Sequence, residues 1–300
     1  MPNIGASVLA KLKNKAKASG VSYQQCLQLF FQEEFLRRLS KSQYNENLIL
    51  KGGLLIYTLT NFESRATIDV DFLLRHWSNT IDDVKRMIEE IINTPTGNDF
   101  IEMSAKGFEE ISPQRKYKGV STQIIGRIRN VRVPFNVDIG VGDIIVPRAE
   151  MRKFNTQLPD FEAPEINTYS LESTIAEKFD AILQRFELTG RMKDFYDIYY
   201  LARTFDFDGA RLRSAIFETL QRRGTPYEKD SFERIVQLVD DEDMQNKWKY
   251  FLKNLRYDSF AFDIVINEIK AFLEPVYEAI ITETEFQWIW KCKESLWAQS

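Results

Sequence analysis

Histidine and cysteine are almost missing from this chain of 300 residues. It holds one histidine, His76, and two cysteines, Cys26 and Cys292, which lie far apart in the sequence. Structural zinc sites take four Cys or His ligands, so a zinc site built from several such residues is excluded. A catalytic triad or a Cys–His pair would have to depend on His76 alone. We interpret His76 as a structural or exposed loop residue.

Long apolar runs are also missing. No stretch of 18 apolar residues occurs, so the sequence predicts no transmembrane helix and no contact with a membrane. The first 20 residues lack the apolar centre of a signal peptide and are typical of a basic amphipathic helix. Because we also expect both cysteines to be free thiols, a cytoplasmic protein is favoured. The net charge of −4 argues against a surface covered in positive charge, but it leaves room for a local basic patch.

The remaining composition is that of a folded protein. The hydrophobic fraction is 44%, and the length suits one large domain or two ordinary ones. Periodicity predicts two helices within residues 6–39, followed by short strands and a few helices over residues 48–147. We therefore predict an α+β fold, with N-terminal helices and a mixed-sheet core in residues 1–165 and an all-α domain in residues 166–300. The helices expected in that second domain are 170–186, 193–203, 209–222, 231–238, 241–254 and 259–280.

Two aspartates lie within one predicted strand, residues 68–74. Val70 and Phe72 share one face of this strand, while Asp69 and Asp71 share the other, because residues i and i+2 point the same way. Neighbouring carboxylates repel each other, and Mg²⁺, which prefers oxygen ligands, relieves that repulsion. A solvated outer strand face explains the same pair, so the pair alone does not establish a metal site.

Two further features favour phosphate chemistry. Gly52-Gly53 lies between a strand-like run and a helical stretch, where small residues let a phosphate approach the backbone N–H groups of a helix N-terminus. Asp138 lies near the end of the predicted strand 131–139, and a third carboxylate suits a two-metal phosphoryl transfer. The alternatives are a tight turn for the glycines and an ordinary strand-end aspartate.

Taken together, the motifs between about residues 45 and 205 resemble those of the polymerase-β-type nucleotidyltransferases. More narrowly, they resemble the AbiEii/AbiGii type, toxin components of bacterial toxin–antitoxin and phage-defence systems. The motifs are Lys51-Gly52-Gly53, Arg65-x-Thr67-x-Asp69-x-Asp71, Asp138, Ala176-Glu177-Lys178 and Arg191-Met-Lys193-Asp194-Phe-Tyr-Asp197. The resemblance implies a nucleotidyltransferase core that the helical domain completes.

The resemblance implies a role for each matching residue. The metal ligands for two Mg²⁺ ions would be Asp69, Asp71 and Asp138, and Asp138 would help to activate the acceptor hydroxyl. The catalytic set would add Lys178 and Asp194. The residues implied to bind the NTP are Gly52, Gly53, Arg65, Thr67, Lys178, Lys193 and Asp197. Alternatives are a solvent-facing, ion-paired helix lysine for Lys178 and helix capping for Asp194.

Two departures from the family pattern stand out. The gap between Gly53 and Asp69 is longer than in most polymerase-β-type enzymes, which leaves the loop position open. Many relatives carry Gly-Ser where this chain has Gly52-Gly53, so phosphate binding there would have to use backbone N–H groups.

The resemblance implies transfer of NMP from an NTP to RNA, with the tRNA 3′ end as the leading acceptor and a cognate antitoxin as partner. A protein acceptor, a nucleotide-binding regulatory module without turnover, and a non-enzymatic interaction protein stay open. Basic residues form a candidate RNA track or a solvated strand edge: Lys106, Arg115, Lys116, Lys118, Arg127, Arg129 and Arg132. The lysines of residues 11–17 are a second candidate. The aromatic residues Phe286, Trp288, Trp290 and Trp297 favour packing of a terminal helix or a partner interface over a stacking platform.

Overall fold

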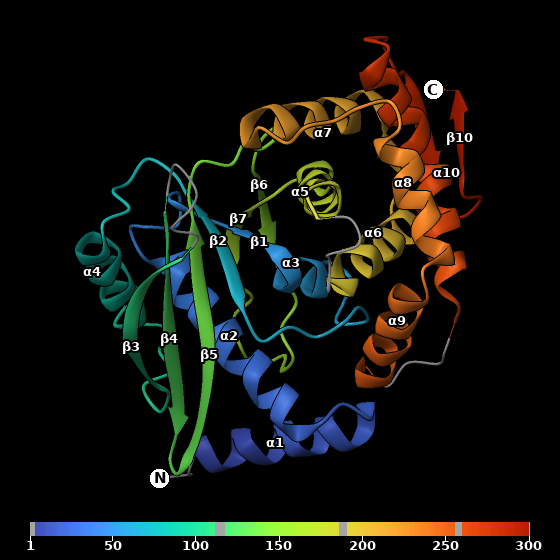
Figure 1. The fold of residues 1–300 in the computed structure, drawn as a ribbon. Coiled ribbons are helices and arrows are strands. Elements are labelled where there is room, and N and C mark those ends of the chain that lie inside the picture. The colour runs from blue at the N-terminus through green and yellow to red at the C-terminus, as the bar shows by residue number, and fades with distance from the viewer. Residues whose placement is uncertain (1–3, 112–117, 186–190, 256–259, 300) are drawn as a thin grey trace. The chain divides into compact units, whose positions relative to one another are not determined.

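The computed structural model describes residues 4–111, 118–185, 191–255 and 260–299 (Figure 1). The chain forms two compact units. The first comprises Met1–Gly142 and Ala149–Tyr169, and the second comprises Asp143–Arg148 and Ser170–Ser300. A mixed sheet with N-terminal helices and a helical C-terminal region confirms the predicted α+β class. The domain boundary after residue 165 stays a prediction.

A sheet of seven strands among the described residues forms the centre of the first unit. The pairs β2–β5 and β1–β7 are parallel, and the other neighbours are antiparallel. In spatial order the strands are β3 (Glu102–Ile111), β4 (Gly119–Ile128), β5 (Val131–Gly140), β2 (Val70–Leu74), β1 (Leu48–Lys51), β7 (Glu165–Thr168) and β6 (Glu150–Lys153). The sheet is therefore mixed, as predicted.

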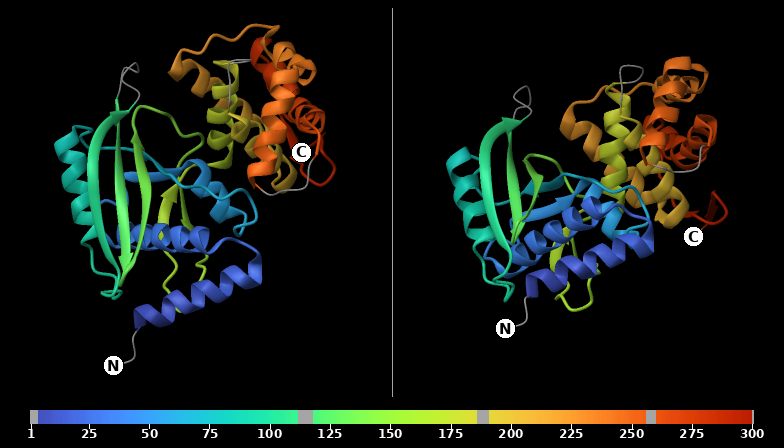
Figure 2. Two further views of the ribbon diagram at one scale, coloured as in Figure 1. Left: turned by 60° about the horizontal axis from the view of Figure 1, so that its bottom comes forward. Right: turned by 90° about the horizontal axis from the view of Figure 1, so that it is seen from below.

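Helices of the first unit pack against this sheet. They are α1 (Ile4–Ser19), α2 (Tyr23–Lys41), α3 (Gly52–Leu59) and α4 (Ile81–Ile92). The ring of Phe35 on α2 lies 6.1 Å from the rings of both Phe72 and Phe135, so α2 packs on the apolar side of β2 and β5. Figure 2 shows α1 beside α2 and α4 beside the β3 edge. The polar side chains of β2 and β5 are therefore left on the face opposite α2.

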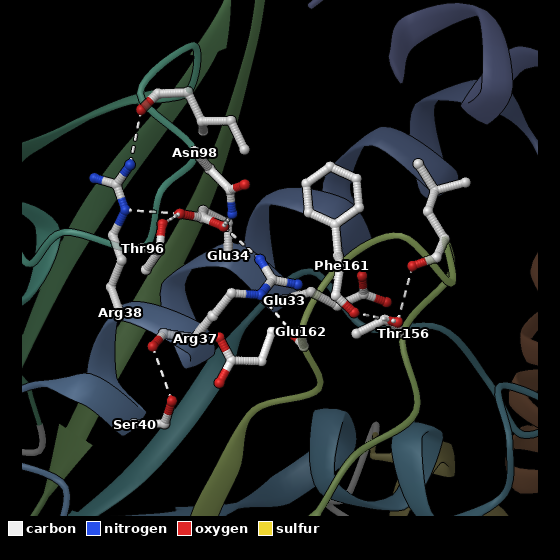
Figure 3. A network of polar contacts seen from close by, with 12 residues as sticks. Glu33, Glu34, Arg37, Arg38, Ser40, Thr96, Asn98, Thr156, Phe161 and Glu162 are labelled. Atoms are coloured by element: carbon white, nitrogen blue, oxygen red, sulfur yellow. Dashed lines mark hydrogen bonds and ion pairs between the residues drawn. The ribbon is translucent and has the colours of Figure 1, made fainter. Parts of the chain in front are cut away.

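A buried polar network fixes α2 to the loops that follow α4 and β6 (Figure 3). Glu34 is fully buried and accepts hydrogen bonds from Arg37 and Arg38 on its own helix. It also accepts from Thr96 Oγ1 at 2.6 Å and Asn98 Nδ2 at 2.8 Å. Because four donors surround this carboxylate, its burial is compensated.

The second unit is mostly helical. Its helices are α5 (Leu171–Leu183), α6 (Met192–Thr204), α7 (Gly209–Arg223), α8 (Ser231–Gln237), α9 (Glu242–Leu255) and α10 (Phe262–Ile281), with a short 3₁₀ helix at Leu238–Asp240. No helix among the described residues is long and apolar enough to cross a membrane.

The prediction that residues 166–300 are all-α is wrong in one detail. A small sheet forms from β8 (Phe207–Asp208), β9 (Trp288–Lys291) and β10 (Leu296–Gln299). Trp290 is fully buried and donates a hydrogen bond from Nε1 to the Ala202 carbonyl at 2.6 Å. Trp297 stacks on Phe272 of α10 at 5.9 Å. Trp290 and Trp297 therefore pack within the protein, as expected, but they lie on strands that contact α6 and α10. Trp288 is exposed.

Candidate active site

Asp71 and Asp138 lie side by side on the polar face of the first unit's sheet. β2 and β5 pair in parallel with these two residues in register, and strands paired this way lie about 4.8 Å apart. On the other side of Asp71, β1 places Lys51 opposite it. On the other side of Asp138, β4 places Ser121 opposite it. We call these four residues the acidic row.

Asp69 joins the same face from the residue just before β2. Asn136, which lies two residues before Asp138 on β5, donates a hydrogen bond from Nδ2 to Asp69 Oδ1 at 3.2 Å. In the acidic row, Ser121 donates from Oγ to Asp138 Oδ1 at 2.5 Å. The three predicted metal ligands therefore come from two neighbouring strands, and each is half-buried.

The Gly-Gly turn meets the acidic row at Asp71. α3 begins at Gly52, which has a φ of 71°, and a Cβ added there would lie 2.1 Å from Asp71 Oδ2. A Cβ added at Gly53 would lie 3.1 Å from Thr67 Oγ1 and 3.5 Å from Arg65 Nη2. The structure thus gathers five of the residues singled out in the sequence. The first backbone N–H groups of α3, which have no partner within their own helix, lie at this turn.

The loop before β2 is held by a residue that the sequence did not single out. Gln32 on α2 is 1% exposed and donates from Nε2 to the Ile68 carbonyl at 2.9 Å and to the Thr67 carbonyl at 3.3 Å. Thr67 in turn donates from Oγ1 to the Asp69 carbonyl at 3.4 Å. A glutamine on an apolar helix face indicates a buried hydrogen bond. The spacing of residues in the sequence does not identify the loop to which Gln32 donates that bond.

The second unit brings together three other predicted residues. Lys178 on α5 places Nζ 2.6 Å from Asp197 Oδ2 and 3.4 Å from Asp194 Oδ1, both on α6. Arg191 Nε lies 2.7 Å from Asp194 Oδ2. Lys178 is 8% exposed, so it is ion-paired but not solvent-facing. The side chain of Asp194 makes these ion pairs, whereas Lys193 is exposed.

Glu177, next to Lys178, is held by a buried arginine that the sequence did not reveal. Arg223 of α7 contacts Glu177 Oε1 at 2.9 Å, Asp180 Oδ2 at 2.8 Å and Asp143 Oδ1 at 2.9 Å. Burial alone would lower the pKa of Arg223, but the carboxylates of Glu177 and Asp143 outweigh it and raise the pKa above its usual range. The short segment 143–148 is thereby fixed to α5 and α7.

Asp69 and the two aspartates of the acidic row form a donor set that fits a magnesium ion chemically. Asp69, Asp71 and Asp138 offer the hard oxygen ligands that Mg²⁺ prefers. Within the described part of the chain, no group of three or more His, Cys, Asp or Glu side chains is already arranged to enclose a metal. Like charges repel, and Asp69 and Asp138 are each directed toward a neutral hydrogen-bond donor on an adjoining strand.

Several basic residues share this polar face. Arg127 on β4 lies opposite Arg132 on β5, and Lys106 on β3 lies opposite Gln123 on β4, which itself lies opposite Asn136. Arg115 and Lys116 lie outside the described residues. In α1, Lys11 pairs with Asp160 and Lys15 donates to the Gln157 carbonyl at 2.9 Å, so two of its lysines have partners within the protein.

His76 is exposed in a turn with a φ of 54°, which confirms its interpretation as an exposed loop residue.

Comparison with known proteins places the chain in a family and a fold. The family model of the nucleotidyl transferase AbiEii toxins of type IV toxin–antitoxin systems matches residues 34–278. Among solved structures, MenT4, a nucleotidyltransferase toxin from Mycobacterium tuberculosis H37Rv, matches with a TM-score of 0.56 at 17% identity, over 91% of this chain and 98% of that one. JHP933 from Helicobacter pylori matches with a TM-score of 0.47 at 12% identity, over 87% and 95% of the two chains. None of the curated proteins matches.

The likeness to MenT4 shows the nucleotidyltransferase fold, and the family match spans most of the chain, including both the acidic row and the Lys178 cluster. The resemblance found in the motifs is thereby confirmed. The chain belongs to the family of nucleotidyl transferase AbiEii toxins of type IV toxin–antitoxin systems.

Proposed function

We propose that this toxin transfers NMP from an NTP to an RNA acceptor, with the 3′ end of tRNA as the leading substrate, in a magnesium-dependent reaction. The observation that carries the proposal is the position of Asp71. This carboxylate lies between Asp138 on one neighbouring strand and the first turn of α3, and Gly52 touches it directly. Carboxylates beside a helix N-terminus bring together ligands for a cation and N–H groups that can donate hydrogen bonds to a phosphate.

In the proposed site, Asp69, Asp71 and Asp138 would hold two Mg²⁺ ions. When bound, these ions neutralise charge on the phosphates and on the leaving oxygen. The backbone N–H groups of Gly52 and Gly53 would bind the triphosphate, because neither of these two residues carries a hydroxyl side chain. Arg65 and Thr67 lie beside Gly53 and would contact the same phosphates. On the family resemblance, Lys178, Lys193 and Asp197 stay proposed nucleotide-binding residues. Lys178 and Asp194 stay proposed members of the catalytic set.

The proposed chemistry is one displacement at phosphorus. The acceptor hydroxyl oxygen forms a bond to the α-phosphorus, and the bond from that phosphorus to the bridging oxygen of the β-phosphate breaks. Pyrophosphate leaves, and the hydroxyl proton goes to the carboxylate of Asp138. Residues that hold the acceptor oxygen in line with the leaving group supply much of the rate.

Basic residues on the polar face of the sheet support RNA as the acceptor. Arg132 lies six residues from Asp138 along β5, a distance of roughly 20 Å for an extended strand, and Arg127 lies opposite Arg132. A strand of RNA crossing this face would pass several phosphates before its end reached Asp138. NTPs and tRNA are cytoplasmic substrates, and we place the reaction there. A cognate antitoxin is the partner that family membership implies.

Labelled-NTP incorporation tests the proposal. We expect wild-type protein with Mg²⁺ to label total tRNA with at least one of the four NTPs. Asp71→Asn should lower labelling about 100-fold or more, since it removes the central carboxylate of the site. Asp82→Asn is the matched control, because Asp82 is an exposed aspartate on α4. Equal labelling by wild type and Asp71→Asn would contradict the proposal, and label in protein alone would replace RNA as the acceptor.

A further inference from the structure

Most of the buried acidic residues of this protein are paired with cations. Glu34 lies between Arg37 and Arg38, and Asp180 is bound to Arg223. Asp194 and Asp197 are bound to Lys178. Such pairing is the usual way to keep a carboxylate charged inside a protein.

Asp138 and Asp69 are held differently. Their hydrogen bonds come from the hydroxyl of Ser121 at 2.5 Å and the amide of Asn136 at 3.2 Å, which are both neutral donors. Each donor binds Oδ1, and no other side-chain hydrogen bond or ion pair of Asp69 or Asp138 occurs among the described residues. A neutral donor fixes the direction of a carboxylate but leaves its full negative charge for a cation.

The local sequence supports a role beyond folding. Asn136 and Asp138 alternate along β5 with Phe135, Val137 and Ile139, which are buried on the other face. Asparagine and aspartate are poor strand formers. Residue types that disfavour the secondary structure in which they lie often mark sites where function has been selected over folding.

We propose that Ser121 and Asn136 are positioning residues of the metal site, which orient Asp138 and Asp69 through their Oδ1 atoms and leave the second carboxylate oxygens for a divalent cation. This inference rests on the proposed function, because it assumes that these aspartates bind metal. Both residues lie on the strand next to the aspartate that they contact. They were not among the site residues expected from the sequence.

Binding of Mn²⁺, followed by the loss of the electron paramagnetic resonance signal of the free ion, tests the inference without any turnover. Ser121→Val and Ser121→Thr are a matched pair, since both are β-branched and similar in volume but only threonine keeps the hydroxyl. We expect Ser121→Val to weaken Mn²⁺ binding about 10-fold to 100-fold, as loss of an outer partner of a metal ligand usually does. Ser121→Thr should bind within a few-fold of wild type. Asn136→Leu, which removes the amide at similar volume, should behave like Ser121→Val.

Gln123→Ala is the control on the same face. Gln123 lies two residues from Ser121 and opposite Asn136, yet no contact of its side chain with Asp69, Asp71 or Asp138 occurs among the described residues. It should bind Mn²⁺ like wild type. Thermal unfolding of each variant without metal shows that the fold is kept. If wild type binds Mn²⁺ and Ser121→Val and Asn136→Leu bind equally well, the inference is wrong but the proposed function stands. If wild type binds no Mn²⁺, with or without NTP, both fail.

Discussion

Gly52 is where the backbone comes closest to the chemistry. Its φ of 71° lies in the left-handed region, and any side chain there would begin 2.1 Å from the Asp71 carboxylate. Two separate costs therefore oppose substitution: backbone strain, which is of order 1 kcal/mol for a residue other than glycine, and displacement of a proposed metal ligand.

Gly52→Ala and Gly97→Ala separate these two costs. Gly97 also has a left-handed backbone, with a φ of 79°, but nothing lies within 4 Å of the position of its missing Cβ. Both variants should lose about 1 kcal/mol of unfolding free energy. Only Gly52→Ala should lose Mn²⁺ binding and nucleotide incorporation, because only there does the new methyl group push Asp71 aside. Full activity of folded Gly52→Ala would contradict this account of the turn.

Glu33 is buried, and among the described residues no cationic side chain is bound to it. Its Oε1 accepts a hydrogen bond from the backbone N–H of Gln157 at 2.9 Å, while Oε2 has no hydrogen-bond partner within the described residues. Burial raises its pKa from 4.5 to about 8. The folded protein therefore holds a proton on Glu33 at neutral pH, whereas the unfolded chain releases it above about pH 4.5.

The sign of the pH dependence follows from this pKa. Between pH 4.5 and about 8 the folded state binds more protons than the unfolded state. Glu33 therefore makes the free energy of unfolding fall by up to about 1.4 kcal/mol per pH unit as the pH rises. Glu33→Gln should remove this decline, so its stability relative to wild type should grow from pH 5 to pH 8. Urea unfolding at several pH values measures it. The exposed Glu46→Gln should show no such trend, and parallel curves for wild type and Glu33→Gln would refute the prediction.

Among single residues, the sequence predicted those whose position follows from their spacing along one element. Alternation placed Asp69 and Asp71 on one face, and the structure agrees, with Asp138 in register beside Asp71. Ser121 and Asn136 could not be found in this way. Their role depends on which strands become neighbours, and strand order is decided by long-range packing that a single sequence does not display.

Among the elements, α5 and α7 are joined by one cation. Arg223 at the end of α7 binds Glu177 and Asp180 of α5, and also Asp143 from the segment 143–148. Asp180 is 1% exposed and also accepts from Thr225. Three carboxylates around one guanidinium leave an excess of negative charge if the cation is removed.

Arg223→Met should therefore destabilise the protein by about 3–5 kcal/mol, the usual result of removing one partner of a buried ion pair. Chemical denaturation at neutral pH measures the loss. Arg211→Met, on the exposed side of the same helix, should change stability by less than about 0.5 kcal/mol. A loss at Arg223 no larger than that at Arg211 would show that the cluster does not hold the helices together.

Elements with strong local signals were predicted well. Apolar spacing predicts a helix at residues 81–92, and α4 has the same ends. Ser22 is a predicted N-cap for the helix that follows it, and this cap forms with Gln25. Periodicity predicts short strands at residues 100–103 and 123–127, and β3 and β4 are both longer. The exposed edge strand β3 has little apolar alternation and contains a bulge at Gly107. The sheet of β8, β9 and β10 was missed because β8 is two residues long and aromatic residues suit several structures.

Charge is a property of the whole molecule, and here a few basic residues lie together within a chain of net negative charge. The net charge is −4, which repels RNA at long range. Arg127 and Arg132 lie opposite each other on the polar face of the sheet, and Lys106 lies nearby on β3. Any RNA acceptor must therefore be captured locally, and its binding should weaken as salt rises.

The double variant Arg127→Glu with Arg132→Glu tests this. The KM for tRNA should rise about 10-fold or more at physiological salt, with kcat little changed, because both arginines would bind the phosphate backbone and not the reacting atoms. The slope of log binding constant against log salt should fall by about one unit for each phosphate that the variant no longer neutralises. Lys85→Glu, on an exposed position of α4, is the control. An unchanged KM and salt slope would remove this face as the acceptor path.

The order of strands in the sheet has a consequence for synthesis of the chain. β1, which carries Lys51 and leads into Gly52, is flanked by β2 and by β7, and β7 ends at Thr168. A nascent chain that has left the ribosome only to residue 150 already contains Asp69, Asp71 and Asp138, but the edge of β1 has no strand to pair with. We expect such early-terminated products to be inactive and prone to aggregation, so that toxicity appears only after the ribosome has passed the residues of β7.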